Sequence, residues 1–159
     1  MRGALRRTRR LAAVNVVPLT EEHALQISGW QYEFPYEWYD TSNDPRRVEL
    51  FAHPAKSETL RAVVDADGAL VGFFNFVREG DEVRLGLGMR HDLTGHGFAQ
   101  PFIRAGLNYA ALEWRPKKFR LWVARWNERA LRAYRRAGFR EVKRDAESRF
   151  VEMEREGLI

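Results

Sequence analysis

The sequence has no cysteine among its 159 residues. This absence excludes disulfides, thiolate nucleophiles and thiolate metal sites together, so any chemistry must come from oxygen, nitrogen and backbone groups. His23, His53 and His91 are not spaced as a metal site on any one predicted element, and no serine stands in a nucleophile-elbow context. We therefore expect neither a metal cofactor nor an acyl-enzyme mechanism.

Long apolar runs are also missing. No stretch approaches the roughly 20 apolar residues that cross a bilayer, and no clean apolar segment with a cleavage site follows the arginine-rich start. We therefore expect a cytoplasmic protein without a membrane partner. With 45% hydrophobic residues the chain can bury one substantial core, but it is short for two ordinary domains. The sequence predicts a basic arm over residues 1–12, expected to be disordered, and a single domain over residues 13–159.

The formal charge of +5 is distributed unevenly. Five arginines lie in the first ten residues, and without them 22 basic side chains balance 22 acidic ones. Residues 11–113 carry 8 basic and 15 acidic side chains, whereas residues 114–144 carry 12 basic and 2 acidic ones. A general affinity for nucleic acid is therefore not expected, although a tether through the basic arm stays open.

Turn signals and periodicity predict a mixture of strands and helices. Strands are predicted at residues 14–19, 60–64, 71–77, 83–89, 119–124, 139–143 and 150–153. Helices are predicted at residues 20–30, 43–53, 98–111 and 127–137. Tight turns at Asp67-Gly68 and Gly80-Asp81 join three of the strands as antiparallel hairpins, and Gly138 closes the last helix. The pattern indicates an α/β fold with a mixed sheet.

A glycine-rich turn, Thr94-Gly95-His96-Gly97-Phe98-Ala99, lies directly between a predicted strand and a predicted helix. Its glycines let the backbone approach an anion, and the first N–H groups of the helix point at that anion. The turn has neither the GK[ST] ending of a P-loop nor a third glycine at dinucleotide spacing after Gly97. Two interpretations stay open at this point: a phosphate cradle, or glycines that serve only a tight connection.

A second motif indicates which ligand is involved. Asn127, Ala130, Tyr134 and Gly138-Phe139 follow one another at spacings of 3, 4, 4 and 1. This segment closely resembles the last helix of the GNAT superfamily of acyl-CoA-dependent N-acetyltransferases, and residues 85–99 resemble that superfamily's cofactor-binding strand and turn. The resemblance covers about residues 14–155. It implies a GNAT fold, with a mixed, strongly bent sheet of about six to seven strands, helices on both faces and acyl-CoA held where two central strands separate.

The resemblance also implies a site for acetyl-CoA. The backbone of one strand would bind the pantetheine arm and acyl carbonyl, at Leu87, Gly88 and Met89. Asn127 would hold the same arm from the other side. Main-chain N–H groups of the turn would hold the pyrophosphate, at Gly95, His96, Gly97, Phe98, Ala99 and Gln100. The family usually has Gln or Arg at the position of Thr94, so part of the anchoring is missing here. The side chain of His96 is either a phosphate contact or an exposed turn residue, and one or two arginines of residues 114–144 are expected to face the phosphates.

Direct acyl transfer needs a neutral amine, a donor to the carbonyl oxygen and an acid for the departing thiolate. The resemblance places the Tyr134 hydroxyl near the thioester sulfur as that acid, and the alternative is an aromatic residue that only packs. The carbonyl donor would be the N–H of Gly88 or of a neighbour. Glu33 and Glu82 are the candidate general bases, acting directly or through water.

The amine acceptor is expected at the segment from Trp30 to Asp40, where six aromatic rings and three carboxylates stand in eleven residues. This mixture suits a cationic small-molecule amine or a peptide N-terminus. The alternative is that Trp30, Phe34 and Trp38, spaced by four, pack one helical face.

Two further functions stay open: a non-catalytic acyl-CoA-binding module, and a nucleic-acid-associated or ribosome-associated protein acting through the basic arm. A homodimer through an exposed edge strand near the C-terminus also stays open. The identity of the acceptor is not predicted.

Overall fold

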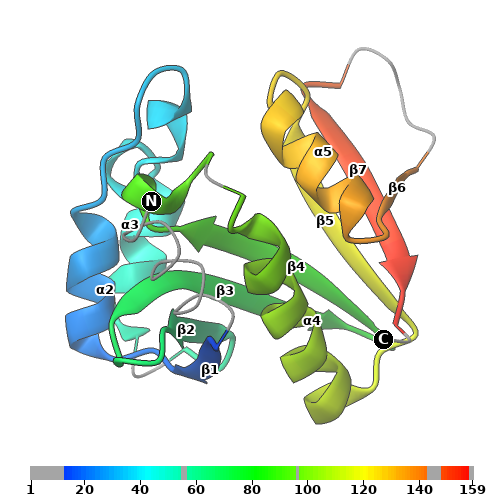
Figure 1. Cartoon of the computed structure of the whole chain (residues 1–159), viewed down its shortest axis with the longest axis horizontal. Coiled ribbons are helices and arrows are strands. Elements are labelled where there is room, and N and C mark those ends of the chain that lie inside the picture. Colours follow the sequence, from blue (N-terminus) through cyan, green and yellow to red (C-terminus); the bar gives the residue numbers. More distant parts are fainter. Residues whose placement is uncertain (1–12, 55–56, 96, 143–147, 158–159) are drawn as a thin grey trace.

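A seven-stranded mixed sheet forms the centre of the fold (Figure 1). The computed structural model of the chain describes residues 13–54, 57–95, 97–142 and 148–157. The strands are β1 Asn15–Pro18, β2 Leu60–Val64, β3 Leu70–Glu79, β4 Glu82–Met89, β5 Lys118–Ala124, β6 Arg140–Glu141 and β7 Phe150–Glu156. Their order in the sheet is β1-β2-β3-β4-β5-β7-β6, with β4 and β5 parallel and the other neighbours antiparallel. The predicted α/β fold class and sheet size are confirmed.

Helices cover both faces of this sheet. They are α2 Glu21–Ser28, α3 Pro45–Ala52, α4 Ala99–Trp114 and α5 Glu128–Arg136, with short 3₁₀ helices η1 Tyr36–Tyr39, η2 Thr41–Asn43 and η4 His91–Leu93. Neighbouring residues of β3 point to opposite faces, so Phe73 joins a core with α2 and α3 while Phe74 joins the core beneath α4. None of the described helices is long and apolar enough to cross a membrane.

Helices α2 and α3 begin within two residues of their predicted starts. Thr20 caps α2, with its side chain accepting from the His23 N–H while His23 Nδ1 accepts from the Thr20 N–H. Asp44 caps α3 ahead of Pro45, its carboxylate accepting from the Arg46 N–H. The expected basic arm, residues 1–12, lies outside the described residues, so the division into arm and domain stays a prediction.

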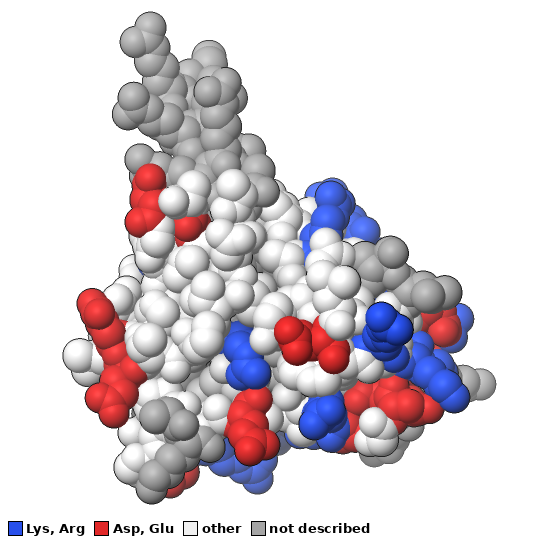
Figure 2. Space-filling model, turned by 90° about the horizontal axis from the view of Figure 1, so that it is seen from below, with Lys and Arg blue, Asp and Glu red and all other residues white. Residues whose placement is uncertain are grey.

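Basic and acidic side chains neutralise each other along the C-terminal half. Ion pairs join Lys117 to Asp81, Lys118 and Arg140 to Glu154, Arg120 to Glu82 and Glu152, and Arg135 to Glu141. On the face drawn in Figure 2, acidic side chains lie among the basic ones. Much of the basic excess of residues 114–144 is therefore used in local ion pairs rather than in one continuous basic surface.

Strands β4 and β5 separate soon after they begin to pair. Their register covers only Glu82 with Lys118, Val83 with Phe119 and Arg84 with Arg120. Beyond these residues the two strands diverge, and the sheet opens between them (Figure 1). The remaining part of β4, from Leu85 to Met89, pairs with β3 on one side only. This opening positions the candidate site.

Close contact between α4 and the sheet depends on two glycines. Gly106 of α4 faces the Phe74 ring, and Gly72 of β3 faces the Phe102 ring. Phe74 stacks between Phe76 and Phe102 with centroid distances of 5.2 and 4.8 Å, and all three rings are buried. These aromatic contacts fix the height of α4 above the sheet and thereby the position of its first turn.

Replacing Gly106 with alanine should destabilise the fold. A Cβ at this position would lie 2.2 Å from Cζ of Phe74, whose ring is fully buried and has no free space to move into. Overpacking costs about 1–3 kcal/mol, which outweighs the roughly 1 kcal/mol that alanine gains over glycine in a helix. Urea unfolding should show a lower midpoint for Gly106→Ala.

The matched control is Asn108→Ala, an exposed position on the same helix. It should leave the midpoint unchanged or raise it slightly. A raised midpoint for Gly106→Ala would show that helix propensity dominates and that α4 does not lie this close to β3.

Candidate functional site

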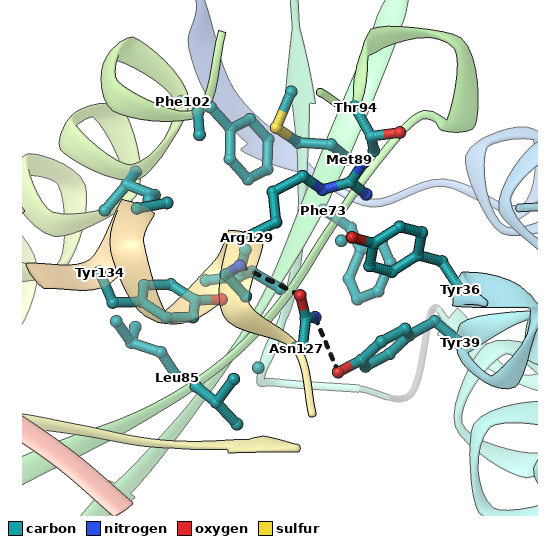
Figure 3. A pocket seen from close by; sticks show the side chains of 18 of the residues that line it. Tyr36, Tyr39, Phe73, Leu85, Met89, Thr94, Phe102, Asn127, Arg129 and Tyr134 are labelled. Carbon is teal, nitrogen blue, oxygen red and sulfur yellow. Dashed lines mark hydrogen bonds between the residues drawn. The ribbon is translucent and has the colours of Figure 1, made fainter. Parts of the chain in front are cut away.

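The opening between β4 and β5 forms a cavity of about 700 Å³. Its lining comes from the end of β4, the middle of β5, the glycine turn, the start of α4 and one side of α5. Residues of α3, of β3 and of the aromatic segment from Trp30 to Asp40 add to the lining. Figure 3 shows Tyr36 and Tyr39 entering from one side and Asn127, Arg129 and Tyr134 from the other. The two halves of the sheet therefore both contribute to one site.

The edge of β4 supplies backbone groups to the cavity. The Arg90 N–H donates to the Val71 carbonyl at 2.8 Å, which makes these residues a hydrogen-bonded pair of the β3–β4 ladder. Hydrogen-bonded and non-bonded pairs alternate in an antiparallel ladder, so Gly88 directs its N–H and C=O to β3 and Leu87 and Met89 direct theirs to the cavity. A backbone donor to a ligand at this edge would therefore come from Leu87 or Met89, not from Gly88.

Gly88 has a different, steric role. A Cβ on Gly88 would lie 2.5 Å from the Phe73 ring. That ring contacts Phe51 with a centroid distance of 5.0 Å and Trp30 at 6.4 Å. Glycine at this position thus leaves room for an aromatic ring on the floor of the cavity.

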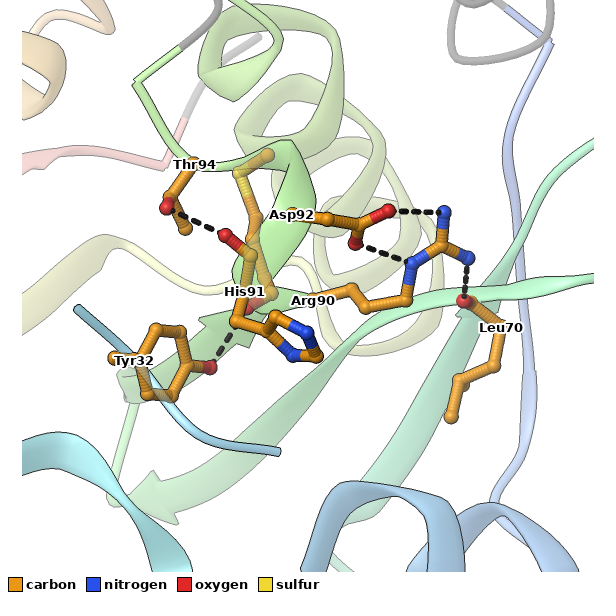
Figure 4. A network of polar contacts seen from close by, with 7 residues as sticks. Tyr32, Leu70, Arg90, His91, Asp92 and Thr94 are labelled. Atoms are coloured by element: carbon orange, nitrogen blue, oxygen red, sulfur yellow. Dashed lines mark hydrogen bonds and ion pairs between the residues drawn. The ribbon is translucent and has the colours of Figure 1, made fainter. Parts of the chain in front are cut away.

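Hydrogen bonds fix the residues that lead from β4 into the glycine turn. Gly95 and Gly97 have φ values of +76° and +79°, in the left-handed region that favours glycine. Arg90 donates to Asp92 at 2.7 Å and to the Leu70 carbonyl at 2.8 Å, and Thr94 Oγ1 donates to the His91 carbonyl at 2.9 Å (Figure 4). His96 lies outside the described residues.

The first turn of α4 lies beside the cavity and brings backbone N–H groups to its edge. Ala99 and Gln100 are its first two residues and line the cavity, and N–H groups in a first helical turn have no partner within the helix. Pro101, the third residue of α4, lies in the first turn, where proline removes no intrahelical hydrogen bond. The Gln100 side chain donates to the Ala133 carbonyl at 2.9 Å and so ties α4 to α5 across the opening.

Three arginines of α5 line the cavity: Arg129, Arg132 and Arg136. The Arg129 guanidinium lies 3.8 Å from the centroid of the Tyr36 ring, and its Nη1 would be 3.1 Å from a Cβ on Gly95. It therefore lies between the glycine turn and the aromatic segment. This guanidinium, the turn and the first N–H groups of α4 make one end of the cavity suited to an anion.

Asn127 joins α5 to the aromatic segment. Its buried side chain caps α5 by accepting from the Ala130 N–H at 3.1 Å, and its Nδ2 donates to the Tyr39 hydroxyl at 3.0 Å (Figure 3). Tyr134 lies one helical turn beyond Ala130, with its hydroxyl pointing into the cavity. Burial, with the Tyr39 hydroxyl as a smaller contribution, raises the pKa of Tyr134 well above its ordinary value.

The two candidate bases lie in different places. Glu33 lines a smaller adjoining cavity of about 310 Å³, which shares Tyr32, Tyr36, Thr94 and Arg129 with the larger one. Glu82 lies at the other end of β4, where that strand still pairs with β5, and its Oε2 is 2.9 Å from Arg120. The structure thus brings Glu33 near the other site residues and places Glu82 away from them.

The comparisons with known proteins agree with this geometry. Residues 9–140 match the family model described as an acetyltransferase (GNAT) domain. The chain belongs to the GNAT acetyltransferase family. The predicted membership and the predicted enzyme class, an acyl-CoA N-acyltransferase, are confirmed. None of the curated proteins matches the sequence.

Several solved GNAT structures share the fold. A chimera of the spermidine N-acetyltransferase SpeG from Vibrio cholerae and hSSAT has a TM-score of 0.72 at 19% identity, over 91% of this chain and 95% of that one. The Vibrio cholerae spermidine N-acetyltransferase in complex with CoA and spermine has a TM-score of 0.65 at 20% identity, over 92% and 96%. The Campylobacter jejuni N-acetyltransferase PseH has a TM-score of 0.66 at 16% identity, over 90% and 97%.

Within this GNAT fold, the segment from Trp30 to Asp40 is not one continuous helix, since only Tyr36–Tyr39 forms the 3₁₀ helix η1, and it is not a purely buried layer. Trp30 is 6% exposed, but Trp38 is 46% and Phe34 86% exposed, so the alternative of one helical face spaced by four is wrong. Tyr36, Trp38 and Tyr39 instead surround Trp126, which follows β5, with centroid distances of 5.7, 6.5 and 5.8 Å. This aromatic bridge closes one side of the GNAT cleft.

Replacing Asn127 with alanine removes the helix cap and the Tyr39 hydrogen bond together. Loss of a cap costs about 1 kcal/mol, and loss of a side-chain hydrogen bond costs about 1 kcal/mol more. We expect Asn127→Ala to lower the free energy of unfolding by about 2 kcal/mol, and Tyr39→Phe by about 1 kcal/mol or less. Denaturant unfolding measures both.

The double variant tests the coupling between the two residues. Once Asn127 is alanine, the Tyr39→Phe change should cost less than it does alone. Strict additivity would contradict the bridge between α5 and η1.

Proposed function

We propose that this chain transfers an acetyl group from acetyl-CoA to a primary amine by direct attack in a ternary complex. The observation that carries the proposal is the cavity where β4 and β5 separate, because it combines an anion-binding end, an unpaired strand edge and a tyrosine hydroxyl in one space. A structural neighbour in complex with CoA and spermine supports acetyl-CoA as the co-substrate.

The residues of the cavity fit this co-substrate. The pyrophosphate would lie at the turn, against the N–H groups of Gly97, Ala99 and Gln100, with Arg129 as a counter-charge. The pantetheine arm would extend between β4 and α5, where Leu87 and Met89 present backbone groups. Since Tyr32 already donates to the Met89 carbonyl at 2.7 Å, the Met89 N–H and the Leu87 backbone are the groups left for the arm.

The chemistry proposed is a single acyl transfer. The amine nitrogen forms a bond to the thioester carbonyl carbon, the carbon–sulfur bond breaks, and the sulfur takes a proton from the Tyr134 hydroxyl. The Tyr134 hydroxyl carries its proton at neutral pH, and burial raises its pKa further. The N–H of Leu87 or Met89 donates to the carbonyl oxygen as its charge grows. Glu33 takes the proton of the attacking amine through water in the adjoining cavity.

Calorimetric titration with acetyl-CoA tests the cofactor site. Gly97→Ala and Gly68→Ala are a matched pair, because both glycines have positive φ and a methyl group on either would meet no atom within 4 Å beyond its neighbours in the chain. Both changes should cost about 1 kcal/mol of stability. Only Gly97→Ala should weaken acetyl-CoA binding, because only Gly97 lies in the glycine-rich turn proposed for the pyrophosphate. The expected loss of affinity is about tenfold, the equivalent of one hydrogen bond to a charged group.

Equal affinities for the two variants would exclude the turn from phosphate binding. Lack of saturable binding by the folded wild-type chain would overturn the proposed function.

Steady-state kinetics with a free-thiol readout test the acid and the base. Tyr134→Phe should lower kcat by about 100-fold, with little change in acetyl-CoA affinity. The folding free energy should stay within about 0.5 kcal/mol, because no other described residue hydrogen-bonds this hydroxyl. Glu33→Gln should lower kcat/KM by about tenfold or more.

An unchanged kcat for Tyr134→Phe would assign this tyrosine to packing alone. An unchanged kcat/KM for Glu33→Gln would show that Glu33 is not the base and that solvent takes the proton of the attacking amine.

A further inference from the structure

The charges around the cavity are of one sign. Among the residues that the structure describes, every charged side chain of the lining is an arginine: Arg47, Arg129, Arg132 and Arg136. The three arginines of α5 lie beside the turn proposed for the phosphates. Arg47 comes from α3, on the opposite side of the cavity, where the acceptor would enter. A positively charged residue at the acceptor end would repel a polycationic substrate such as a polyamine.

The carboxylates of the aromatic segment do not offset these arginines. Asp40 Oδ1 accepts from the Tyr32 backbone N–H at 2.8 Å, and Asp40 is not part of the lining. Glu37 is also absent from the lining, and Glu33 lines only the smaller adjoining cavity. None of the three carboxylates of this segment therefore lines the main cavity, and only Glu33 lines the adjoining one.

Arg47 is held in place but has hydrogen-bonding capacity to spare. Its Nη1 donates to the Trp38 carbonyl at 3.2 Å, and its Nε lies 3.6 Å from the Asp44 carboxylate. The guanidinium also lies over the rings of Trp38 and Tyr39, with centroid distances of 5.2 and 5.6 Å. The hydrogens on Nη2 have no partner among the described residues, and the side chain is 25% exposed. Such a group binds a carboxylate well, because its orientation is already fixed.

Asn75 supplies a second polar group to the same side of the cavity. Its Oδ1 is buried and has no hydrogen-bond partner among the described residues. Asn75 and Phe73 project from the same face of β3, opposite Gly86 and Gly88 of β4. Gly86, directly opposite Asn75, has no side chain that could pair with this amide. An unpaired buried acceptor of this kind favours a ligand that donates a hydrogen bond, such as an amine.

We propose that the acceptor is a small primary amine that carries a carboxylate and an apolar body, as an apolar α-amino acid does, with Arg47 as the residue that selects the carboxylate. The proposal rests on the proposed transferase function and specifies its substrate class. Arg47 would pair with the carboxylate, Asn75 would accept from the amine, and Trp30, Phe51 and Phe73 would contact the apolar part.

The electrostatics favour the same choice. Positive neighbours lower the pKa of an ammonium group, which promotes the neutral amine that attacks. A zwitterion gains attraction at its carboxylate in exchange, whereas a polyamine has no carboxylate to pair with Arg47 and would meet repulsion from the arginines of the main cavity. The spermidine named for structural neighbours is therefore a poor match to this lining.

Acceptor kinetics with the full chain and acetyl-CoA test the inference. The probes are phenylalanine, phenylalaninol, in which a hydroxymethyl group replaces the carboxylate, and spermidine. Wild type should acetylate phenylalanine with a kcat/KM about tenfold or more above phenylalaninol, and spermidine more slowly than either. Arg47→Gln should bring the ratio of the first two toward one, and Arg47→Lys should keep part of it. The matched control is Arg46→Gln, the exposed neighbour on α3, which should leave the ratio unchanged.

Phenylalaninol or spermidine used as well as phenylalanine would overturn the inference, as would an unchanged ratio in Arg47→Gln. Absence of turnover with phenylalanine, while acetyl-CoA binding persists and is weakened by Gly97→Ala, would overturn the inference and leave the cofactor site standing. Absence of acetyl-CoA binding would instead overturn the proposed function.

Discussion

The end of pairing between β4 and β5 after Arg84 and Arg120 is the constraint on which the rest of the site depends. Beyond that point, backbone groups of Leu87 and Met89 face a cavity rather than a neighbouring strand. Buried backbone donors and acceptors need partners, so a strand edge left open inside a protein is suited to a ligand that supplies them. In the proposed complex, an extended arm with amide groups takes the place of the missing strand.

Contacts across this opening fix the distance between its two sides. The Gln100 side chain ties the start of α4 to α5, and the Asn127 side chain ties α5 to the aromatic segment through Tyr39. The rings around Trp126 add a second, apolar connection between the two halves. The same residues that shape the cavity thus also hold the two parts of the sheet relative to each other, which couples the site to the stability of the fold.

Much of this arrangement was accessible from the sequence. The glycines at the hairpins and the approximate positions of the strands follow from local rules, and Asn127 and Tyr134 became candidates through a family motif. Arg47 and Asn75 were missed, because nothing in the spacing of α3 or β3 shows which side chains face a cavity formed by distant segments. The position of Glu82 was also hidden, since its ion pair with Arg120 depends on the pairing of two strands separated by α4. The conformation of residues 31–44 escaped prediction because contacts to Trp126 and Asn127, far along the chain, hold it.

A crystal structure of the chain with bound CoA would test the proposed cofactor site most directly. We expect the pantetheine arm between β4 and β5, with hydrogen bonds to the Leu87 or Met89 backbone, the pyrophosphate at Gly97 to Gln100, and the sulfur near the Tyr134 hydroxyl. Clear density for CoA outside this opening, with β4 and β5 unchanged and the cavity between them filled by side chains or water, would contradict it.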